Sequence, residues 1–276
     1  MKQKVERAIR LIQAAAKIAH DNNSPLEIAY SGGKDSDVIL ELAKMSGVEF
    51  RAMYKNTTID PPGTIAHAKS KGVEIVRPTT TFGKLIAAHG FPSRWARFCC
   101  SELKEYKIFD YAVLGIRRDE SSKRAARYHE PELCRVYRGG QKSRHYYPLL
   151  DWTAQDVAEF VKTYNVQCHP LYYDENGTFH PERRLGCMCC PLASSRKRIE
   201  EFRKHPNMVK LYVRYGQQWL DRHPNVKSHE SFDNAFEMFV GTLFFESKAA
   251  FQSAKNGLFG TIDCKEILER EFKIKF

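Results

Sequence analysis

The hexapeptide Ser31–Ser36, which reads Ser-Gly-Gly-Lys-Asp-Ser, constrains the fold of this chain more than any other segment. It follows an apolar segment, residues 26–30, that alternates like a buried strand. It precedes apolar residues that recur at helical spacing from Val38 to Met45. Two glycines permit a sharp turn that brings backbone N–H groups close to a ligand, and the next helix directs its positive dipole end at the same place. The pattern predicts a strand–loop–helix unit that binds an anion.

The loop differs from the two commonest phosphate-binding motifs. A Walker loop has four residues between its first glycine and Gly-Lys-Ser/Thr, and a dinucleotide-binding fold has G-x-G-x-x-G. Neither pattern occurs at residues 31–36. The alternative interpretation is an ordinary strand-to-helix turn in which Asp35 or Ser36 lies near the helix cap.

Strand-like and helix-like segments alternate through residues 1–165, which predicts an α/β fold with a mostly parallel, twisted sheet flanked by helices. The predicted strands are residues 26–30, 48–54, 73–76 and 112–116. The predicted helices are residues 5–19, 38–45, 64–70, 83–89 and 156–164. Residues 194–276 carry helical patterns and little strand character, and aromatic stripes such as Phe232, Phe236 and Phe239 are expected to be core. We therefore expect an α/β domain at 1–193 and a helical extension at 194–276.

The chain carries a formal net charge of +11, from 44 Lys+Arg against 33 Asp+Glu. This excess suits polyanionic partners such as nucleotides, sulfate esters or nucleic acid, although general solubility is an alternative explanation. No apolar stretch approaches the length of a membrane span, and the N-terminus lacks a secretory apolar region. These features predict a cytoplasmic protein with no membrane partner. Eight cysteines in such a compartment are not expected to form a disulfide framework.

Two cysteine groups stand far apart in the sequence, Cys99-Cys100 and Cys187-x-x-Cys190. Four thiolates can bind Zn²⁺ or a [4Fe–4S] cluster, and the Cys-x-x-Cys spacing lets two sulfurs bind one centre. The alternative interpretation is that the cysteines pack as small buried apolar side chains. We adopt this interpretation for the three isolated cysteines, Cys134, Cys168 and Cys264.

Arg117 and Arg118 follow the predicted strand 112–116. Ligands of open α/β sheets bind beyond the carboxyl ends of strands, and guanidinium groups match phosphate and sulfate oxygens in bidentate fashion. These arginines are therefore expected to meet the anion held at residues 31–36. Arg183 and Arg184 are candidates to close the site from another side. A solvated charged turn is the alternative.

Six segments, taken in order, resemble the phosphoadenosine phosphosulfate (PAPS) reductase family of the ATP-pyrophosphatase superfamily, which has the adenine nucleotide alpha hydrolase-like fold. The resemblance covers roughly residues 25–195. The matching segments are Ser31–Ser36, Asn56–Pro62, Cys99-Cys100, Gly115–Ser121, Pro148–Thr153 and Cys187–Pro191.

The resemblance implies an adenine nucleotide, which is ATP, adenosine phosphosulfate (APS) or PAPS. It implies nucleotide binding by Ser31, Gly32, Gly33, Lys34, Asp35, Ser36, Arg117 and Arg118, with Lys34, Asp35, Arg117 and Arg118 as the catalytic set. In the branch that uses APS, the matching cysteines carry a [4Fe–4S] cluster. The implied ligands are Cys99, Cys100, Cys187 and Cys190, with Cys189 as an alternative ligand and Zn²⁺ as the alternative metal.

The reductases end in a tail with Glu-Cys-Gly-Leu-His, whose cysteine attacks the sulfur of the sulfonucleotide. The only tail cysteine of this chain is Cys264, in the different context Asp263-Cys264-Lys265. Cys264 is accordingly the candidate nucleophile.

Three functions are consistent with these features. The first is sulfur transfer or reduction of APS or PAPS to sulfite with a thioredoxin-like reductant. The second is an ATP-pyrophosphatase that adenylates an acceptor so that a sulfur donor can modify nucleic acid, as in tRNA thiolation or DNA phosphorothioation. The third is a regulator that binds nucleotide or cluster without turnover.

Overall fold

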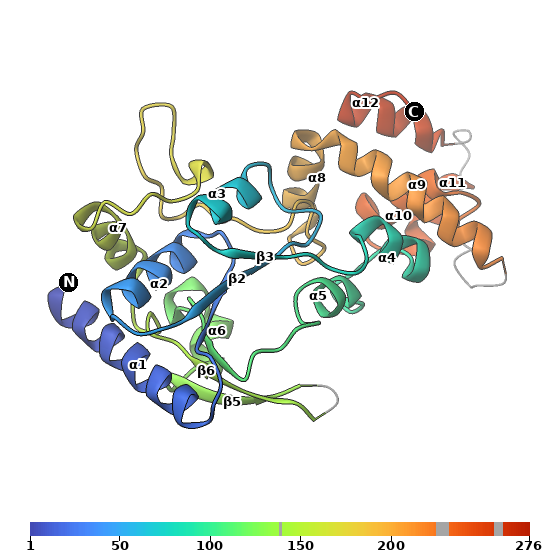
Figure 1. Cartoon of the computed structure of the whole chain (residues 1–276). Helices are drawn as coiled ribbons and strands as arrows, with labels where there is room; N and C mark the ends of the chain where they lie inside the picture. The colour runs from blue at the N-terminus through green and yellow to red at the C-terminus, as the bar shows by residue number, and fades with distance from the viewer. Residues whose placement is uncertain (138–139, 225–231, 257–261) are drawn as a thin grey trace. The chain divides into compact units, whose positions relative to one another are not determined.

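A computed structural model describes residues 1–137, 140–224, 232–256 and 262–276 (Figure 1). The chain divides into two compact units, each built from separate segments. The first unit comprises Met1–Asn56, Asp60–Arg77 and Glu105–Gly186. The second comprises Thr57–Ile59, Pro78–Lys104 and Cys187–Phe276. The domain boundary at residue 193 stays a prediction.

The first unit contains a six-stranded sheet, which confirms the predicted α/β class. Its strand order is β3-β2-β1-β4-β6-β5, and every neighbouring pair is parallel except β5 with β6. From β1 the chain builds outward through β2 to β3, and β4 then pairs with the opposite side of β1. The switch point of the topology therefore lies between β1 and β4, where ligands of such sheets bind. The strands are β1 (Glu27–Tyr30), β2 (Arg51–Lys55), β3 (Glu74–Val76), β4 (Tyr111–Val113), β5 (Glu132–Val136) and β6 (Lys142–Tyr146).

Helices α1, α2 and α7 pack together against one face of this sheet (Figure 1). Their apolar faces enclose Ile28 of β1, Val113 of β4 and Tyr146 of β6, all fully buried. Thr153 is the N-cap residue of α7 and forms a reciprocal cap with Asp156. The helical elements of this unit are α1 (Lys2–Asp21), α2 (Lys34–Met45), α3 (Thr64–Ser70), η1 (Arg118–Glu120), α6 (Ser122–Arg127), α7 (Ala154–Thr163) and η2 (Pro170–Tyr172).

Strands β5 and β6 were not predicted from the sequence. β5 is an edge strand that is exposed over most of its length, so it has no apolar face. β6 reads Lys-Ser-Arg-His-Tyr and buries Ser143 and His145, two polar residues, on its inward side. A period-two apolar pattern is the signal for a half-buried strand, and neither segment has it.

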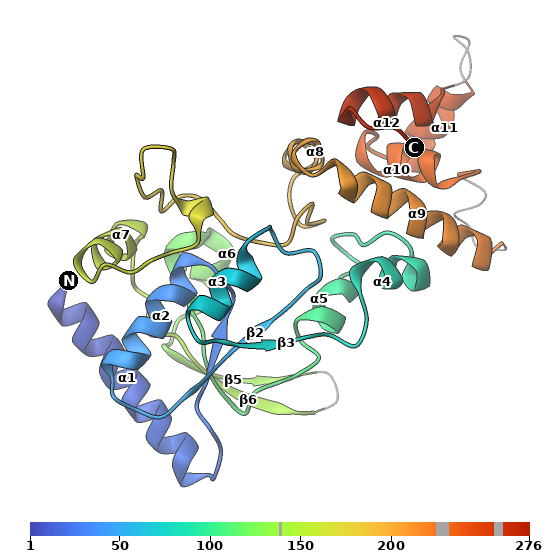
Figure 2. The same cartoon turned by 45° about the horizontal axis from the view of Figure 1, so that its top comes forward.

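The second unit is helical, as predicted for residues 194–276, wherever those residues are described; residues 225–231 and 257–261 lie outside the described part. Figure 2 shows α9 as the long orange helix of this unit, with α4 beside it. The core is largely aromatic, and the rings of Phe202, Tyr212 and Phe239 meet edge to face with centroids 5.0–5.7 Å apart. The helices are α4 (Phe82–His89), α5 (Phe98–Leu103), α8 (Ser195–Lys204), α9 (Pro206–Arg222), α10 (Ala235–Leu243), α11 (Lys248–Lys255) and α12 (Cys264–Phe272).

Among the described residues, no helix combines the length and the apolar character needed to cross a bilayer.

The buried His145 makes the stability of the first unit depend on pH. Its ring lies 3.2 Å from the Tyr147 hydroxyl, and burial, with the nearby Arg135 charge, lowers its pKa from 6.5 to about 4. Neutral His145 therefore stabilises the fold above its unfolded pKa, and this contribution is lost as the pH falls through 6.5 towards 4. The free energy of unfolding should fall by about 2 kcal/mol between about pH 7 and about pH 5.

Urea denaturation at the two pH values measures this loss. His145→Gln should flatten the pH dependence, because glutamine does not titrate. The exposed His129, changed to Gln, is the control. An unchanged pH dependence in His145→Gln would contradict the assignment.

Candidate functional site

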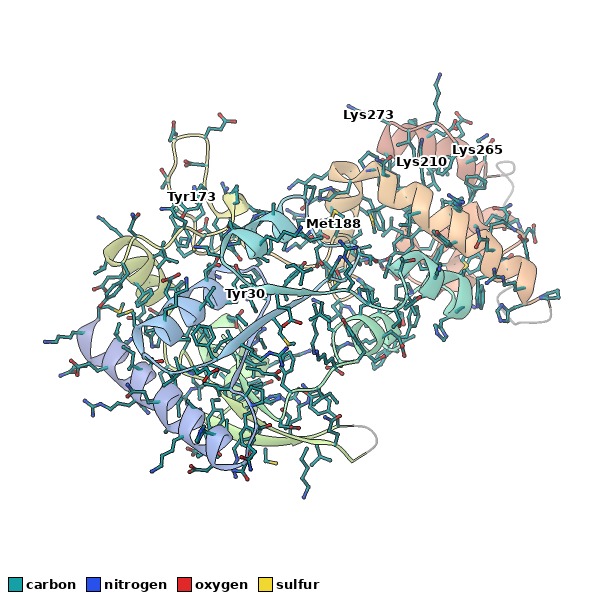
Figure 3. The ribbon with its side chains drawn as sticks, in the orientation of Figure 1. Tyr30, Tyr173, Met188, Lys210, Lys265 and Lys273 are labelled. Carbon is teal, nitrogen blue, oxygen red and sulfur yellow. The ribbon has the colours of Figure 1, made fainter. Side chains whose placement is uncertain are left out.

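The loop Ser31–Ser36 connects β1 directly to α2 at the switch point of the sheet. Tyr30, labelled in Figure 3, ends β1, and Gly33 is the N-cap residue of α2. Gly32 adopts a left-handed φ of +77°, and a Cβ there would lie 2.8 Å from the Thr64 methyl group, so only glycine fits. The Ser31 and Ser36 hydroxyls lie 3.2 Å apart on the inside of the turn. The loop thus has the strand–loop–helix setting that the sequence predicts for an anion site.

Asp35 joins this loop to the segment that follows β4. Its carboxylate accepts hydrogen bonds from Lys34 Nζ at 2.9 Å and from Arg117 Nε at 2.7 Å. Arg117 is 3% exposed, and its Nη1 also donates to Asp119 Oδ2 at 3.1 Å and to the Trp152 carbonyl at 3.3 Å. Two cations are therefore held on either side of the same carboxylate, at the start of a helix.

Gly115 allows the two segments to approach each other. A Cβ at this position would lie 3.0 Å from the backbone carbon and oxygen of Asp35. Backbone atoms cannot rotate away as a flexible side chain can, so a side chain here would require the Asp35 backbone to shift by a few tenths of an ångström. The absence of a Cβ at residue 115 thus permits the close approach of the two loops.

Two further arginines extend the positive charge around Asp35. Arg184 Nη2 donates to the Glu120 carbonyl at 2.6 Å, and Arg124 pairs with the Glu120 carboxylate. Burial lowers the pKa of Arg124, and the neighbouring Arg184 and Arg117 charges act in the same direction. Mutual repulsion among guanidinium groups in one place favours binding of a polyanion there.

The other two predicted arginines have different contacts. Arg118 pairs with Asp151, and its backbone N–H donates to the Leu150 carbonyl at 2.9 Å, so its side chain is bound away from Asp35. Arg183 donates to the carbonyls of Leu171 and Tyr173 at 3.1 and 2.7 Å and therefore holds the segment around η2 in place.

A buried polar network supports the loop from below. The Asp37 carboxylate, one turn into α2, accepts a hydrogen bond from Tyr30 Oη at 2.5 Å and lies 3.0 Å from His67 Nε2 on α3. Burial, together with the Asp37 charge, raises the pKa of Tyr30. The network connects β1, α2 and α3, which flank the loop, and it fixes their relative positions.

The four predicted cysteine ligands all belong to the second unit. Cys99 and Cys100 lie on α5, and Cys187 and Cys190 flank the turn that contains Met188 (Figure 3). The thiols are close enough that Cys99 interacts electrostatically with the other three. Cys100 accepts from Cys99 and faces Arg97, whose Nη2 lies 3.8 Å from its sulfur, and these contacts lower the pKa of Cys100.

Four thiols are suitable ligands for a metal or an iron–sulfur cluster, but their side chains are not arranged as such a site in the structure. In the described ranges, no group of three or more His, Cys, Asp or Glu side chains is arranged so that it could hold a metal ion. Cys189 has a left-handed φ of 53° and directs its thiol into the apolar core. Binding of a metal or cluster would require the thiols of Cys99, Cys100, Cys187 and Cys190 to move together.

Cys264 is the first residue of α12, next to Lys265 (Figure 3). It is 4% exposed and belongs to the apolar core of the second unit. Burial, with the Glu237 charge, raises its pKa to about 11. Thiolate attack requires exposure and a lowered pKa, so neither property favours Cys264 as the nucleophile.

The sequence analysis did not identify Arg124 as a residue near Asp35. It also did not identify Gly115 as the residue that permits the close approach of the two loops. The signal for Arg124 was available, because Ser121 caps the short helix α6 and places Arg124 one turn after Glu120. The sequence alone could not show which of Arg117 and Arg118 faces the loop, since adjacent side chains leave the backbone in different directions.

The fold and loop define a class of proteins, namely α/β proteins with a glycine-containing loop at the carboxyl end of a central parallel strand. Residues 25–193 match the model of the phosphoadenosine phosphosulfate reductase domain, and the chain belongs to this family.

This chain matches its relatives over only part of their length. An uncharacterized protein of Methanocaldococcus jannaschii is 24% identical over 222 residues, which are 75% of this chain and 51% of that protein. An uncharacterized protein of Escherichia phage 186 is 32% identical over 51% of this chain and 44% of its own. Sulfate adenylyltransferase subunit 2 of Shewanella sp. ANA-3 is 29% identical over 59% of this chain and 64% of its own. The chain thus spans about half to two-thirds of the length of these relatives.

Among solved structures, a PAPS reductase from Candida auris in complex with phosphate is similar to this chain. The match covers 64% of this chain and 87% of the reductase chain. It is 16% identical, with a TM-score of 0.42.

Gly115→Ala should destabilise the first unit, because the added methyl meets the backbone of Asp35. We expect a loss of about 1–3 kcal/mol in the free energy of unfolding, as for other overpacked sites. Gly186→Ala is the matched control, since a Cβ at Gly186 has no neighbour within 4 Å. Urea denaturation measures both variants. Equal stability of Gly115→Ala and the control would contradict the close approach of the two loops.

Proposed function

We propose that the first unit binds an adenine nucleotide with its phosphate chain on residues 31–36, and that it transfers the adenylyl group of ATP to an acceptor with release of pyrophosphate. The observation that carries this proposal is the set of cations around Asp35. Lys34 and Arg117 contact the carboxylate directly, and Arg124 and Arg184 lie nearby. Family membership and the similarity to a sulfate adenylyltransferase subunit support a nucleotide as ligand.

In the proposed reaction an acceptor oxygen attacks the α-phosphorus of ATP. A bond forms between the acceptor and the α-phosphorus, and the bond from the α-phosphorus to the bridging oxygen of the β-phosphate breaks. Pyrophosphate leaves with the electron pair. An acceptor whose attacking oxygen carries a proton loses that proton to solvent, and sulfate has none to lose. Negative charge grows on the leaving group, so fixed cations that match its oxygens stabilise the transition state.

The Asp35 carboxylate would exchange partners when the phosphates bind. In the structure Asp35 pairs with Lys34 and Arg117 and keeps both side chains at the loop. A polyphosphate offers more charge than one carboxylate and can draw the same two cations to itself. Asp35 is therefore a residue that positions the two cations. Its removal should weaken nucleotide binding, even though loss of a negative charge alone would favour a bound polyphosphate.

Arg117→Ala should weaken ATP binding about 10- to 100-fold, the amount expected for loss of a charge-assisted hydrogen bond. Arg118→Ala should have a much smaller effect because its side chain is engaged with Asp151. Arg10→Ala, which removes an exposed charge from α1, controls for general electrostatics. Calorimetric titration with Mg²⁺-ATP measures all three.

Pyrophosphate release then tests the reaction, with sulfate, RNA and DNA supplied separately as acceptors. Asp35→Ala should abolish release with whichever acceptor is active. Equal ATP affinity in Arg117→Ala and Arg10→Ala would contradict the site. Tight ATP binding without pyrophosphate release with any of these acceptors would contradict the proposed transfer and favour the non-catalytic regulator.

A second candidate is reduction of APS or PAPS to sulfite by a protein that holds a [4Fe–4S] cluster on Cys99, Cys100, Cys187 and Cys190. The observation that favours it is that all four cysteines lie in one unit, two on α5 and two at the turn that contains Met188. A thioredoxin-like protein would supply the electrons. The raised pKa of Cys264 weighs against this candidate, which is why it ranks second.

Metal analysis of protein purified without oxygen tests the cysteine assignment independently of activity. The cluster predicts a brown protein with iron and acid-labile sulfide, both of which Cys187→Ser should lower. Cys134→Ser, which alters an exposed thiol of the first unit, is the control. Stoichiometric zinc would replace the cluster with the alternative metal, and absence of iron and zinc would contradict both.

A further inference from the structure

A cavity of about 840 Å³ lies within the second unit, in a part of the chain that the proposed reaction does not use. Its lining comes from three segments, within residues 91–95, 191–198 and 241–248. A cavity of this size accommodates a group as large as a nucleotide.

The cavity carries uncompensated positive charge. Arg94, Arg198 and Lys248 line it, against the single carboxylate of Glu246. Within the described residues, none of the three cations pairs with a carboxylate. Lys248 Nζ lies 5.7 Å from the centroid of the Phe232 ring, and the Nε of Arg198 is buried without a hydrogen-bond partner. Cations that have no carboxylate partner around a cavity favour an anionic ligand.

An exposed indole stands at the same cavity. Trp95 is 96% exposed, although tryptophan is highly buried on average. Its turn is fixed, because the Ser93 hydroxyl accepts hydrogen bonds from the backbone N–H groups of Trp95 at 3.2 Å and Ala96 at 3.0 Å. Arg94 Nη2 also donates to the Ala193 carbonyl at 3.3 Å. The backbone of this turn is held by hydrogen bonds, and the indole face of Trp95 is open to solvent, where a base can stack on it.

Two helices begin at this cavity. Ser194 caps α8 and Ser247 caps α11, and both serines line the cavity. The positive dipole ends of the two helices add to the field of the three cations and favour phosphate in particular. Phosphate-binding groups beside an exposed aromatic ring are the combination that binds single strands, in which the bases are free to stack.

We propose that this cavity binds single-stranded nucleic acid, with a base stacked on Trp95 and the adjoining phosphates on Arg94, Arg198 and Lys248. Duplex is excluded from this mode because its bases are already stacked. The proposal goes beyond the nucleotide site of the first unit and does not rest on it. If both hold, the strand bound here is the class of acceptor that the first unit would adenylate.

Fluorescence anisotropy of the full chain with labelled oligonucleotides of about 12 nucleotides tests this proposal. Oligo-dT and oligo-U distinguish DNA from RNA, and a hairpin duplex tests the requirement for unpaired bases. Trp95→Ala should weaken binding about tenfold, and Trp95→Phe should retain most of it. Arg94→Gln should lower the slope of log affinity against log salt by about 0.7, the value for one phosphate contact on a single strand.

The controls separate this cavity from general electrostatics. Lys210 is exposed on α9, labelled in Figure 3, and does not line the cavity. Lys210→Gln should leave affinity unchanged, and Glu246→Gln should strengthen it. Thermal unfolding by circular dichroism shows that the variants remain folded.

Four results would overturn the proposal. Equal weakening by Lys210→Gln and Arg94→Gln would show diffuse polyanion binding. Duplex binding as tight as single-strand binding, or full affinity in Trp95→Ala, would exclude stacking. Stronger competition by polyglutamate than by unlabelled oligo-dT would assign the cavity to an acidic protein segment. The ATP affinity of the first unit is measured separately, so its failure is distinguishable from failure here.

Discussion

The contact of Asp35 with Lys34 and Arg117 organises the first unit, because it joins the loop after β1 to the segment after β4. In a parallel sheet these two loops leave neighbouring strands at the same edge, and only a close backbone approach lets their side chains meet. Gly115 provides that approach, and the buried Asp37 network holds β1, α2 and α3 around it. These features together hold the Arg117 guanidinium beside the loop that contains Lys34.

The sequence predicted the parts of this site that depend on local rules. Gly32 and Gly33 demand a turn, the apolar residues on either side set a strand and a helix, and an arginine after a strand belongs at the carboxyl edge of a sheet. The choice between Arg117 and Arg118 and the contribution of Arg124 depend on tertiary packing instead. β5 and β6 escaped prediction for a related reason, since an exposed edge strand and an inward-facing His145 leave no apolar alternation to read.

The second unit shows the same division between local and tertiary information. Its helices and aromatic core follow from the spacing of apolar residues, and the cysteine groups are visible in the sequence as a possible metal site. The sequence alone does not reveal the burial of Cys264 and Cys189, or that Trp95, Arg198 and Lys248 line one cavity. These properties arise where segments distant in the chain converge. They argue against Cys264 as a nucleophile and favour the cavity lined by Arg94, Arg198 and Lys248 as a binding site.

We propose that residues 31–36 and the cations around Asp35 bind the phosphate chain of an adenine nucleotide. A comparison of the affinities of ATP and adenosine, for the intact protein and for Lys34→Ala, tests this directly. We expect ATP to bind the intact protein at least about 100-fold more tightly than adenosine, because the phosphates supply most of the binding, and we expect Lys34→Ala to narrow this ratio. Equal affinity for ATP and adenosine, or a ratio that Lys34→Ala leaves unchanged, would contradict it.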